Sequence, residues 1–148
     1  MITIPLTEPE VRELVENWYS ALDTHAETAE MLGYLADKGL EMKFPEAKVR
    51  GHAGFTKWYE GIVNTFFDEV HTLQKLDIEI AQDGLSAVVN LVGEWDASRW
   101  KAPQPKSERL MMMADQTWTI IRDTTSGHSI IQKYKVNSLT PMPGSVAL

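Results

Sequence analysis

Residues 68–95, DEVHTLQKLDIEIAQDGLSAVVNLVGEW, contain two strand patterns separated by the turn signal Asp83-Gly84. The first pattern is the alternation of a half-buried strand, with apolar positions at Leu76, Ile78 and Ile80. The second pattern, over residues 85–95, is more continuously apolar. We therefore expect a β-hairpin here, with His71 at the head of its first strand, and we expect the rest of the chain to be arranged around it.

The composition is that of an ordinary folded protein. The chain has 148 residues, 43% hydrophobic and 24% charged, which argues against disorder and predicts one domain over residues 1–148. The formal net charge of −7 disfavours binding to nucleic acid or to an anionic membrane, and the absence of cysteine excludes disulfides and thiolate chemistry. No apolar run approaches a membrane span, and the first ten residues lack a signal peptide's basic region, so we expect a cytoplasmic protein.

Three helices are expected. The first is predicted over residues 7–23, where Thr7 and Glu10 form a capping-box pattern ahead of an apolar face. The same pattern recurs at Thr24 and Glu27, and it predicts a second, shorter helix that Gly39 would stop. The third helix follows Gly51 and has the clearest helical periodicity in the chain, at Phe55, Trp58, Tyr59, Ile62, Val63 and Phe66.

Strands occupy most of the remaining chain. A short strand is predicted over residues 40–44, where Pro45 stops it, and longer strands over residues 109–122 and 129–139. A polar loop at residues 97–107 is long enough to form a rim or lid. Helices followed by a run of strands predict an α+β fold, with the helices gathered on one face of a curved antiparallel sheet.

Alternation along the last two strands assigns side chains to the two faces of this sheet. Lys133 and Lys135 belong in water, so Tyr134 is expected beneath the helices, on the same face as Gln116 and Trp118. The outer face is then expected to carry Met111, Met113, Thr117, Val89, Leu91 and Trp95. A broad apolar patch predicts a homo-oligomer, most simply a dimer with Trp95 and Met113 near its centre. Alternatively, the tail at residues 140–148 covers the patch and leaves a monomer.

The order of elements resembles the nuclear transport factor 2-like fold, in its SnoaL-like branch of small enzymes, over residues 7–143. That branch forms a cone with a pocket between helices and concave sheet. It includes ketosteroid isomerase, polyketide cyclases, scytalone dehydratase and hexachlorocyclohexane dehydrochlorinase. The resemblance implies a small apolar or aromatic ligand, and association as dimers or, alternatively, trimers. We expect no cofactor.

The resemblance can be carried over residue by residue. The positions of the steroid isomerase's base and two oxyanion donors fall at Phe44, Trp18 and Trp118, none of which is a suitable acid. The dehydratase and dehydrochlorinase pattern is retained: an aspartate at the end of the first helix, Asp23, orients a histidine at the start of a strand, His71. The positions of the dehydrochlorinase's auxiliary basic residues fall at Trp18 and Gln132, and neither of these is basic. This argues against halide elimination.

Asp23 and His71 are therefore the expected catalytic residues. A carboxylate that holds one imidazole nitrogen fixes the tautomer and stabilises the imidazolium that forms when the other nitrogen takes a proton. Strict alternation from Ile78 puts His71 on the wrong face, unless a bulge intervenes within residues 72–75. The alternative is that Asp23 only ends a helix and His71 is a satisfied histidine at a strand edge.

The remaining expectations concern the pocket. Its lining is predicted to consist of Trp18, Phe44, Trp58, Tyr59, Trp118 and Tyr134, with Asn90 and Gln132 as the scarce polar contacts. The other histidines, His25, His52 and His128, are expected to be solvated, and no spacing on one element suggests a metal site. Two functions stay open: a lyase or isomerase that removes a proton next to an activating group, and a non-catalytic ligand-binding or assembly module.

Overall fold

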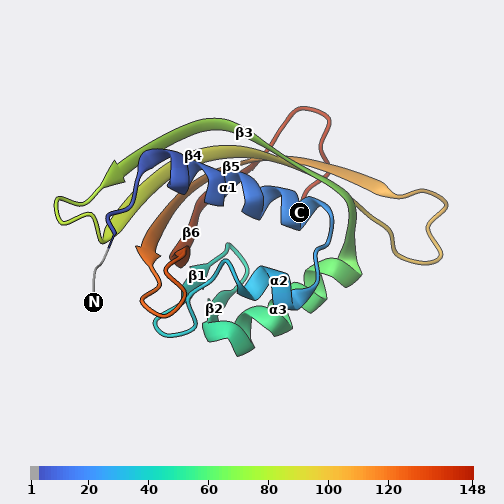
Figure 1. The fold of residues 1–148 in the computed structure, drawn as a ribbon. Coiled ribbons are helices and arrows are strands. Elements are labelled where there is room, and N and C mark those ends of the chain that lie inside the picture. The colour runs from blue at the N-terminus through green and yellow to red at the C-terminus, as the bar shows by residue number, and fades with distance from the viewer. Residues whose placement is uncertain (1–3) are drawn as a thin grey trace.

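The computed structural model describes residues 4–148 as a curved sheet that arches over three helices (Figure 1). The helices are α1 (Glu8–Asp23), α2 (Thr28–Leu32) and α3 (Gly51–Thr65). The strands are β1 (Glu41–Lys43), β2 (Lys48–Arg50), β3 (Phe66–Ile80), β4 (Ser86–Arg99), β5 (Glu108–Arg122) and β6 (Ser129–Pro141). Their order is β2-β1-β6-β5-β4-β3. The predicted α+β cone is confirmed, with two additions: β2 was not expected, and β1 pairs with β6 in parallel.

The first helix begins where it was predicted to begin, but the second helix begins later than predicted. Thr7 Oγ1 accepts a hydrogen bond from the Glu10 amide at 3.3 Å and caps α1. The predicted capping role of Thr24 is wrong, because its hydroxyl donates back to the Ser20 carbonyl of α1 at 3.0 Å. The second helix begins after Glu27 and ends at Leu32, several residues before Gly39. No helix among residues 4–148 has the length and apolar character needed to cross a membrane.

A bulge in β3 decides where His71 lies. The pairing of β3 with β4 shifts by one residue between Leu73 and Lys75, which leaves Gln74 as an extra residue. Side chains alternate along a strand, so one extra residue exchanges the two faces beyond it. His71 therefore lies on the concave side together with the apolar positions Leu76, Ile78 and Ile80. The bulge falls within the stretch where the sequence required one.

Register corrects several predicted positions. Val89 pairs directly with Trp118, and residues directly opposite each other share a face, so Val89 is buried. The outward positions predicted for Val89, Leu91 and Trp95 are therefore wrong. Asn90, predicted to face the pocket, is instead exposed on the outer face. In β6 the pairing shifts between Thr119 and Ile120 of its partner strand, so Ile131 faces the core and Gln132 does not.

The outer face of the sheet is more polar than predicted. Met111 and Met113 are half-buried there, and Val88 is exposed. Between them, Thr117 Oγ1 donates to Asn90 Oδ1 at 3.0 Å and accepts from Asn137 Nδ2 at 3.0 Å. The tail after β6 continues beside β5, with a hydrogen bond from the Met142 amide to the Met111 carbonyl at 2.8 Å.

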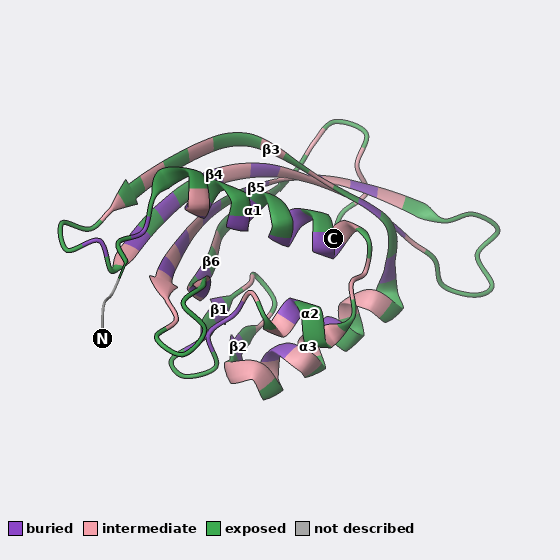
Figure 2. Ribbon diagram, viewed as in Figure 1, coloured by how far each residue is buried: buried purple, intermediate pink, exposed green. Residues whose placement is uncertain are grey.

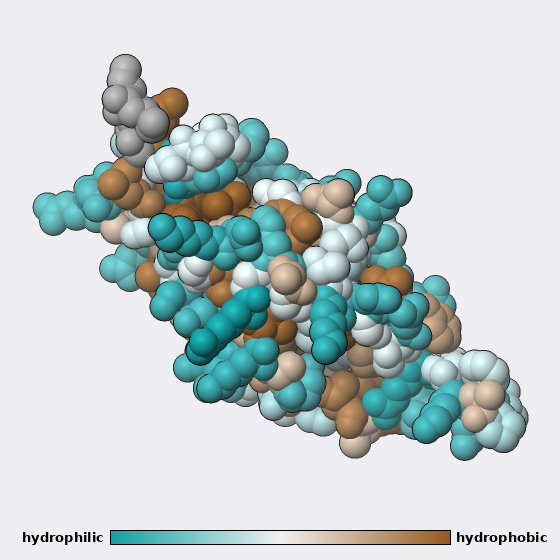
Figure 3. Space-filling view, turned by 90° about the horizontal axis from the view of Figure 1, so that it is seen from below, coloured by the Kyte–Doolittle hydropathy of each residue, from teal (hydrophilic) through white to brown (hydrophobic). Residues whose placement is uncertain are grey.

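The core lies between α1 and the concave face. Buried positions alternate along β4 and β5 (Figure 2). The buried residues of α1 pack with those of both strands in one cluster. The largest fully buried side chains are Trp18, Trp118 and Phe55. Seen from below, the surface mixes hydrophilic side chains with separate apolar patches (Figure 3), as expected for a chain of net charge −7.

Candidate functional site

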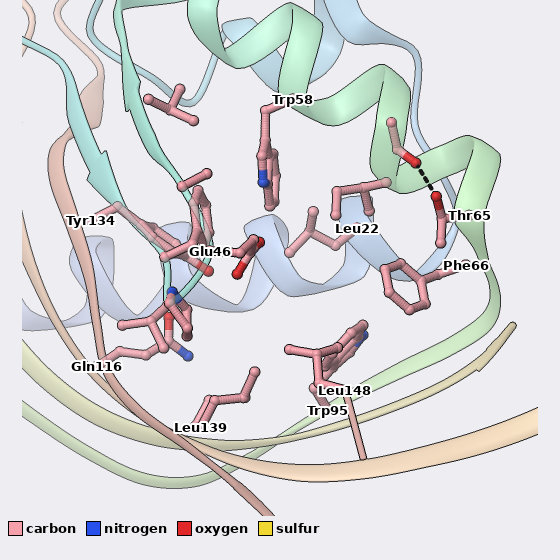
Figure 4. A pocket seen from close by; sticks show the side chains of 18 of the residues that line it. Leu22, Glu46, Trp58, Thr65, Phe66, Trp95, Gln116, Tyr134, Leu139 and Leu148 are labelled. Carbon is pink, nitrogen blue, oxygen red and sulfur yellow. Dashed lines mark hydrogen bonds between the residues drawn. The ribbon is translucent and has the colours of Figure 1, made fainter. Parts of the chain in front are cut away.

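A pocket of about 720 Å³ opens between α3, the β1–β2 turn and the concave face of the sheet. Gly93 and Ala114 pair across β4 and β5 and form its floor. Glycine has no side chain, and a Cβ atom at position 93 would meet the Tyr19 side chain, which also lines the pocket. In Figure 4, Trp58 extends from α3 into the pocket toward the sheet, and Trp95 and Leu139 extend into the pocket from the strands. The volume suits a small organic molecule.

Three of the predicted aromatic residues line this pocket. Phe44 and Trp58 stack at 4.1 Å between ring centroids with an interplanar angle of 9°, and Tyr134 tilts against Phe44 at 5.6 Å. The other three predicted aromatics lie behind this wall in the core, which corrects the prediction for Trp18, Tyr59 and Trp118. Tyr134 stacks on Trp118 at 4.7 Å and covers it. The predicted pocket contacts of Asn90 and Gln132 are also wrong, because neither residue lines the pocket.

Asp23 and His71 meet at the edge of the pocket. The last residue of α1, Asp23, places Oδ1 at 2.5 Å from His71 Nδ1, and its Oδ2 accepts from the His71 amide at 3.0 Å. A negative charge at a helix C-terminus is unfavourable, and these two hydrogen bonds offset that cost. His71 lines the pocket with 13% of its side chain exposed. Nothing in the described residues bonds its Nε2, so this nitrogen is available to a ligand.

Tyr19 and Gln116 add a polar pair beside His71. The Tyr19 ring stacks on His71 at 5.0 Å, and its hydroxyl accepts a hydrogen bond from Gln116 Nε2 at 3.1 Å. Trp118 Nε1 donates to Gln116 Oε1 at 3.0 Å, which fixes the orientation of this amide. Burial, with smaller contributions from Tyr134 and Asp23, raises the pKa of Tyr19, so its hydroxyl stays protonated. Both residues line the pocket, and among residues 4–148 the Tyr19 hydroxyl hydrogen and the second Gln116 N–H have no acceptor, which leaves them for a ligand.

A second histidine–carboxylate pair lies next to the first. His25 Nε2 contacts Glu69 Oε2, and Glu69 Oε1 accepts a hydrogen bond from Trp95 Nε1 at 3.0 Å. Glu69 and Trp95 both line the pocket. The prediction that His25 is merely solvated is wrong. His52 also has a partner, because its Nε2 lies 2.9 Å from the Leu35 carbonyl.

Sequence reasoning missed several pocket residues, and for some of them a signal existed. Tyr19 stands four residues before Asp23, a spacing that puts both on one face of a helix. Glu69 stands two residues before His71 and so shares its face of the strand. No comparable pattern marks the exposed side chains that surround the pocket, Glu46, Lys48, Arg50 and Lys57.

Comparisons with known proteins bear on the fold. No protein-family model matches the sequence, and no curated protein does. Solved structures do match. A provisionally named scytalone dehydratase from Novosphingobium aromaticivorans is 14% identical, with a TM-score of 0.67 over 95% of this chain and 88% of the other. A provisionally named aromatic ring hydroxylase from the same organism is 12% identical, with a TM-score of 0.76 over 90% and 92%.

The hexachlorocyclohexane dehydrochlorinase LinA-type3 from Novosphingobium barchaimii is 16% identical, with a TM-score of 0.67 over 95% of this chain and 92% of the other. Other matching structures are described as having a cystatin-like fold. Likenesses of such low identity show the fold alone. They confirm the resemblance to the nuclear transport factor 2-like fold that the order of elements indicated.

Proposed function

We propose that this chain, which shares the fold of these structures, binds a small apolar or aromatic molecule in the pocket and removes a proton from it, as a lyase or isomerase does. The observation that supports the proposal is the contact between Asp23 and His71 at the pocket wall. Two of the structural neighbours bear the names of a dehydratase and a dehydrochlorinase, which denote elimination reactions.

The arrangement suits general-base chemistry. Since Nδ1 of His71 donates to Asp23, the neutral imidazole keeps a lone pair on Nε2. When Nε2 takes a proton from carbon, the Asp23 carboxylate and the negative end of α1 stabilise the imidazolium. The hydrogen-bond donors of Tyr19 and Gln116 would stabilise negative charge on a carbonyl oxygen next to that carbon.

The second candidate is a ligand-binding module without chemistry. The stacked Phe44 and Trp58 and the apolar residues around them favour binding of a flat molecule, whether or not a reaction follows. In this case Asp23 would serve to fasten α1 to β3 through its two hydrogen bonds with His71.

The two candidates differ in the fate of 5-nitrobenzisoxazole, a flat aromatic probe that opens when a base removes its ring proton. We expect the wild-type protein to open it. His71→Asn should reduce the rate by roughly 100-fold or more, as is common when a general base is lost. Asp23→Asn should also reduce it, because the amide cannot stabilise the imidazolium in the same way.

His128→Asn is the matched control, since His128 is exposed in the turn before β6 and should leave the rate unchanged. A rate that is equal in the wild type and in His71→Asn would refute the proposed base. If the probe quenches tryptophan fluorescence but is never opened, the binding module is the better description.

A further inference from the structure

Glu69 is a buried carboxylate that the general-base mechanism leaves unused. Only 3% of its side chain is exposed, and burying such a group is costly unless it is paired. Both of its oxygens have partners, Trp95 Nε1 on Oε1 and His25 Nε2 on Oε2. The carboxylate is therefore held in one orientation at the wall of the pocket.

The two histidine–carboxylate pairs have opposite orientations. In the first, the imidazole of His71 is the less exposed partner, with 13% of its side chain accessible against 24% for Asp23. In the second, the carboxylate of Glu69 is the buried partner, and His25 has 25% of its side chain accessible. One pair thus presents an imidazole to the pocket, and the other presents a carboxyl group two residues away on the same strand.

His25, which contacts Glu69, is partly exposed and so connects this buried carboxylate with the surface. A groove on the far side of Glu69 is lined by Asp23, Thr24, His25, Phe67, Asp68, Glu69, Val70 and Arg109. Glu69 is therefore shared between the pocket and this groove. Nη1 of Arg109 donates to the Asp68 carbonyl at 2.7 Å and to Ser98 Oγ at 2.9 Å, and neither bond involves Glu69. His25 is the titratable group that joins Glu69 to the groove.

We propose that His25 and Glu69 form a proton relay from the surface into the pocket, and that Glu69 is the acid that protonates a departing hydroxyl group. This inference rests on the proposed function, since it gives the elimination its second proton transfer, and it names the substrate class as β-hydroxy carbonyl compounds. Acid and base would then stand on one strand, two residues apart.

The step balances as follows. His71 Nε2 takes the proton from carbon, and the C–H electron pair becomes the new C=C bond. The C–O bond breaks with its electron pair on oxygen, which takes the proton of Glu69 and leaves as water. His25 takes a proton from solvent in the groove on Nδ1 and passes the proton on Nε2 to Glu69. His71 releases its proton to water.

Two probe substrates distinguish the role of Glu69 as an acid from the role of His71 as a base, because the leaving group must be protonated in only one of them. 4-Hydroxy-4-phenylbutan-2-one loses water to give a conjugated ketone, and its hydroxide must be protonated as it leaves. 5-Nitrobenzisoxazole opens to a stabilised phenolate, which needs no acid. Glu69→Gln should therefore reduce dehydration by roughly 100-fold, as for other lost general acids, and change ring opening by less than about threefold.

The variants are designed to keep the fold. The glutamine amide can still accept from Trp95 and donate to His25, so both contacts of position 69 are retained. His25 has a φ of 50°, which asparagine tolerates well, so His25→Asn removes the imidazole without backbone strain. Imidazole added to His25→Asn should restore dehydration through the groove. Glu79→Gln, an exposed glutamate of β3, is the matched control.

Each outcome decides the inference. Selective loss of dehydration in Glu69→Gln, with imidazole rescue of His25→Asn, supports the relay. Equal effects of Glu69→Gln on both probes overturn it, as does a wild-type protein that opens the benzisoxazole but never dehydrates the ketone; both results leave the Asp23–His71 base standing. A wild-type protein that transforms neither probe overturns the relay and the proposed function together.

Discussion

Replacing Gly93 by alanine tests how closely Tyr19 is packed against the floor of the pocket. A Cβ atom at position 93 would lie 2.5 Å from the Tyr19 hydroxyl oxygen and 3.2 Å from its Cζ. An ordinary contact begins at 3.4 Å, so the ring would have to retreat by about 0.9 Å, the difference between 3.4 and 2.5 Å. Tyr19 cannot retreat freely, because it stacks on His71 and meets Trp118 edge-on at 6.1 Å.

The expected cost follows from these contacts. Overpacking a buried site costs about 1–3 kcal/mol, and a displaced hydroxyl also weakens the Gln116 hydrogen bond, worth about 1 kcal/mol. Gly93→Ala should thus lower the free energy of unfolding by about 2–4 kcal/mol. For a chain of this size that corresponds to a melting temperature lowered by roughly 5–15 °C.

Thermal denaturation followed by circular dichroism measures this shift. Gly61→Ala on α3 is the control, because an added Cβ there meets nothing within 4 Å and alanine favours a helix by about 0.5–1 kcal/mol. In the double variant with Tyr19→Phe, the closest clash is removed, so part of the loss should be recovered. A Gly93→Ala protein as stable as the wild type would show that this close packing does not exist.

Three further predictions concern other parts of the molecule. Arg122 donates to both carboxylate oxygens of Glu10, at 2.9 and 2.6 Å. Arg122→Lys should therefore lower the free energy of unfolding, measured in urea, by about 1–3 kcal/mol; no measurable change would show that this pair of hydrogen bonds does not stabilise the fold. We propose a homo-oligomer through the apolar side chains that remain on the outer face of the sheet, the half-buried Met113 and the exposed Val88. Light scattering should then show Met113→Glu as a monomer; an unchanged mass, or a wild-type monomer at micromolar concentration, would refute it. Trp58→Ala should weaken binding of 2-naphthol roughly tenfold by calorimetry, whereas Trp100→Ala, in an exposed loop, should not; equal effects would place the ligand elsewhere.

Long periodic segments were predictable because their pattern is repeated many times. Thr7 marks the start of α1 with a capping side chain, and the apolar stripe that follows defines the buried face. The short elements were less accessible. Only three residues form β2, and α2 ends at Leu32, so neither has enough turns or alternations to stand out.

The lining of the pocket depended on details that periodicity does not carry. Trp95 was assigned to the wrong face because the pairing of β4 with β5 cannot be read from either strand alone. An extra residue in β6 turns Gln132 away from the pocket, and no pattern in the neighbouring sequence predicts this bulge. Contacts between segments that are distant in the sequence, such as that of His25 with Glu69, cannot be predicted from periodicity.

The extra residue at Gln74 has a consequence for how such a pocket changes by descent. Removal of this single codon would restore regular pairing between Val70 and Ile80 and exchange the two faces of β3 before position 74. His71 would then leave the concave wall in exchange for Val70 or Thr72, while the apolar positions from Leu76 onward would keep their places. A one-residue insertion or deletion, rather than any substitution, would thus be the shortest genetic route between a cone that presents His71 to its pocket and one that does not.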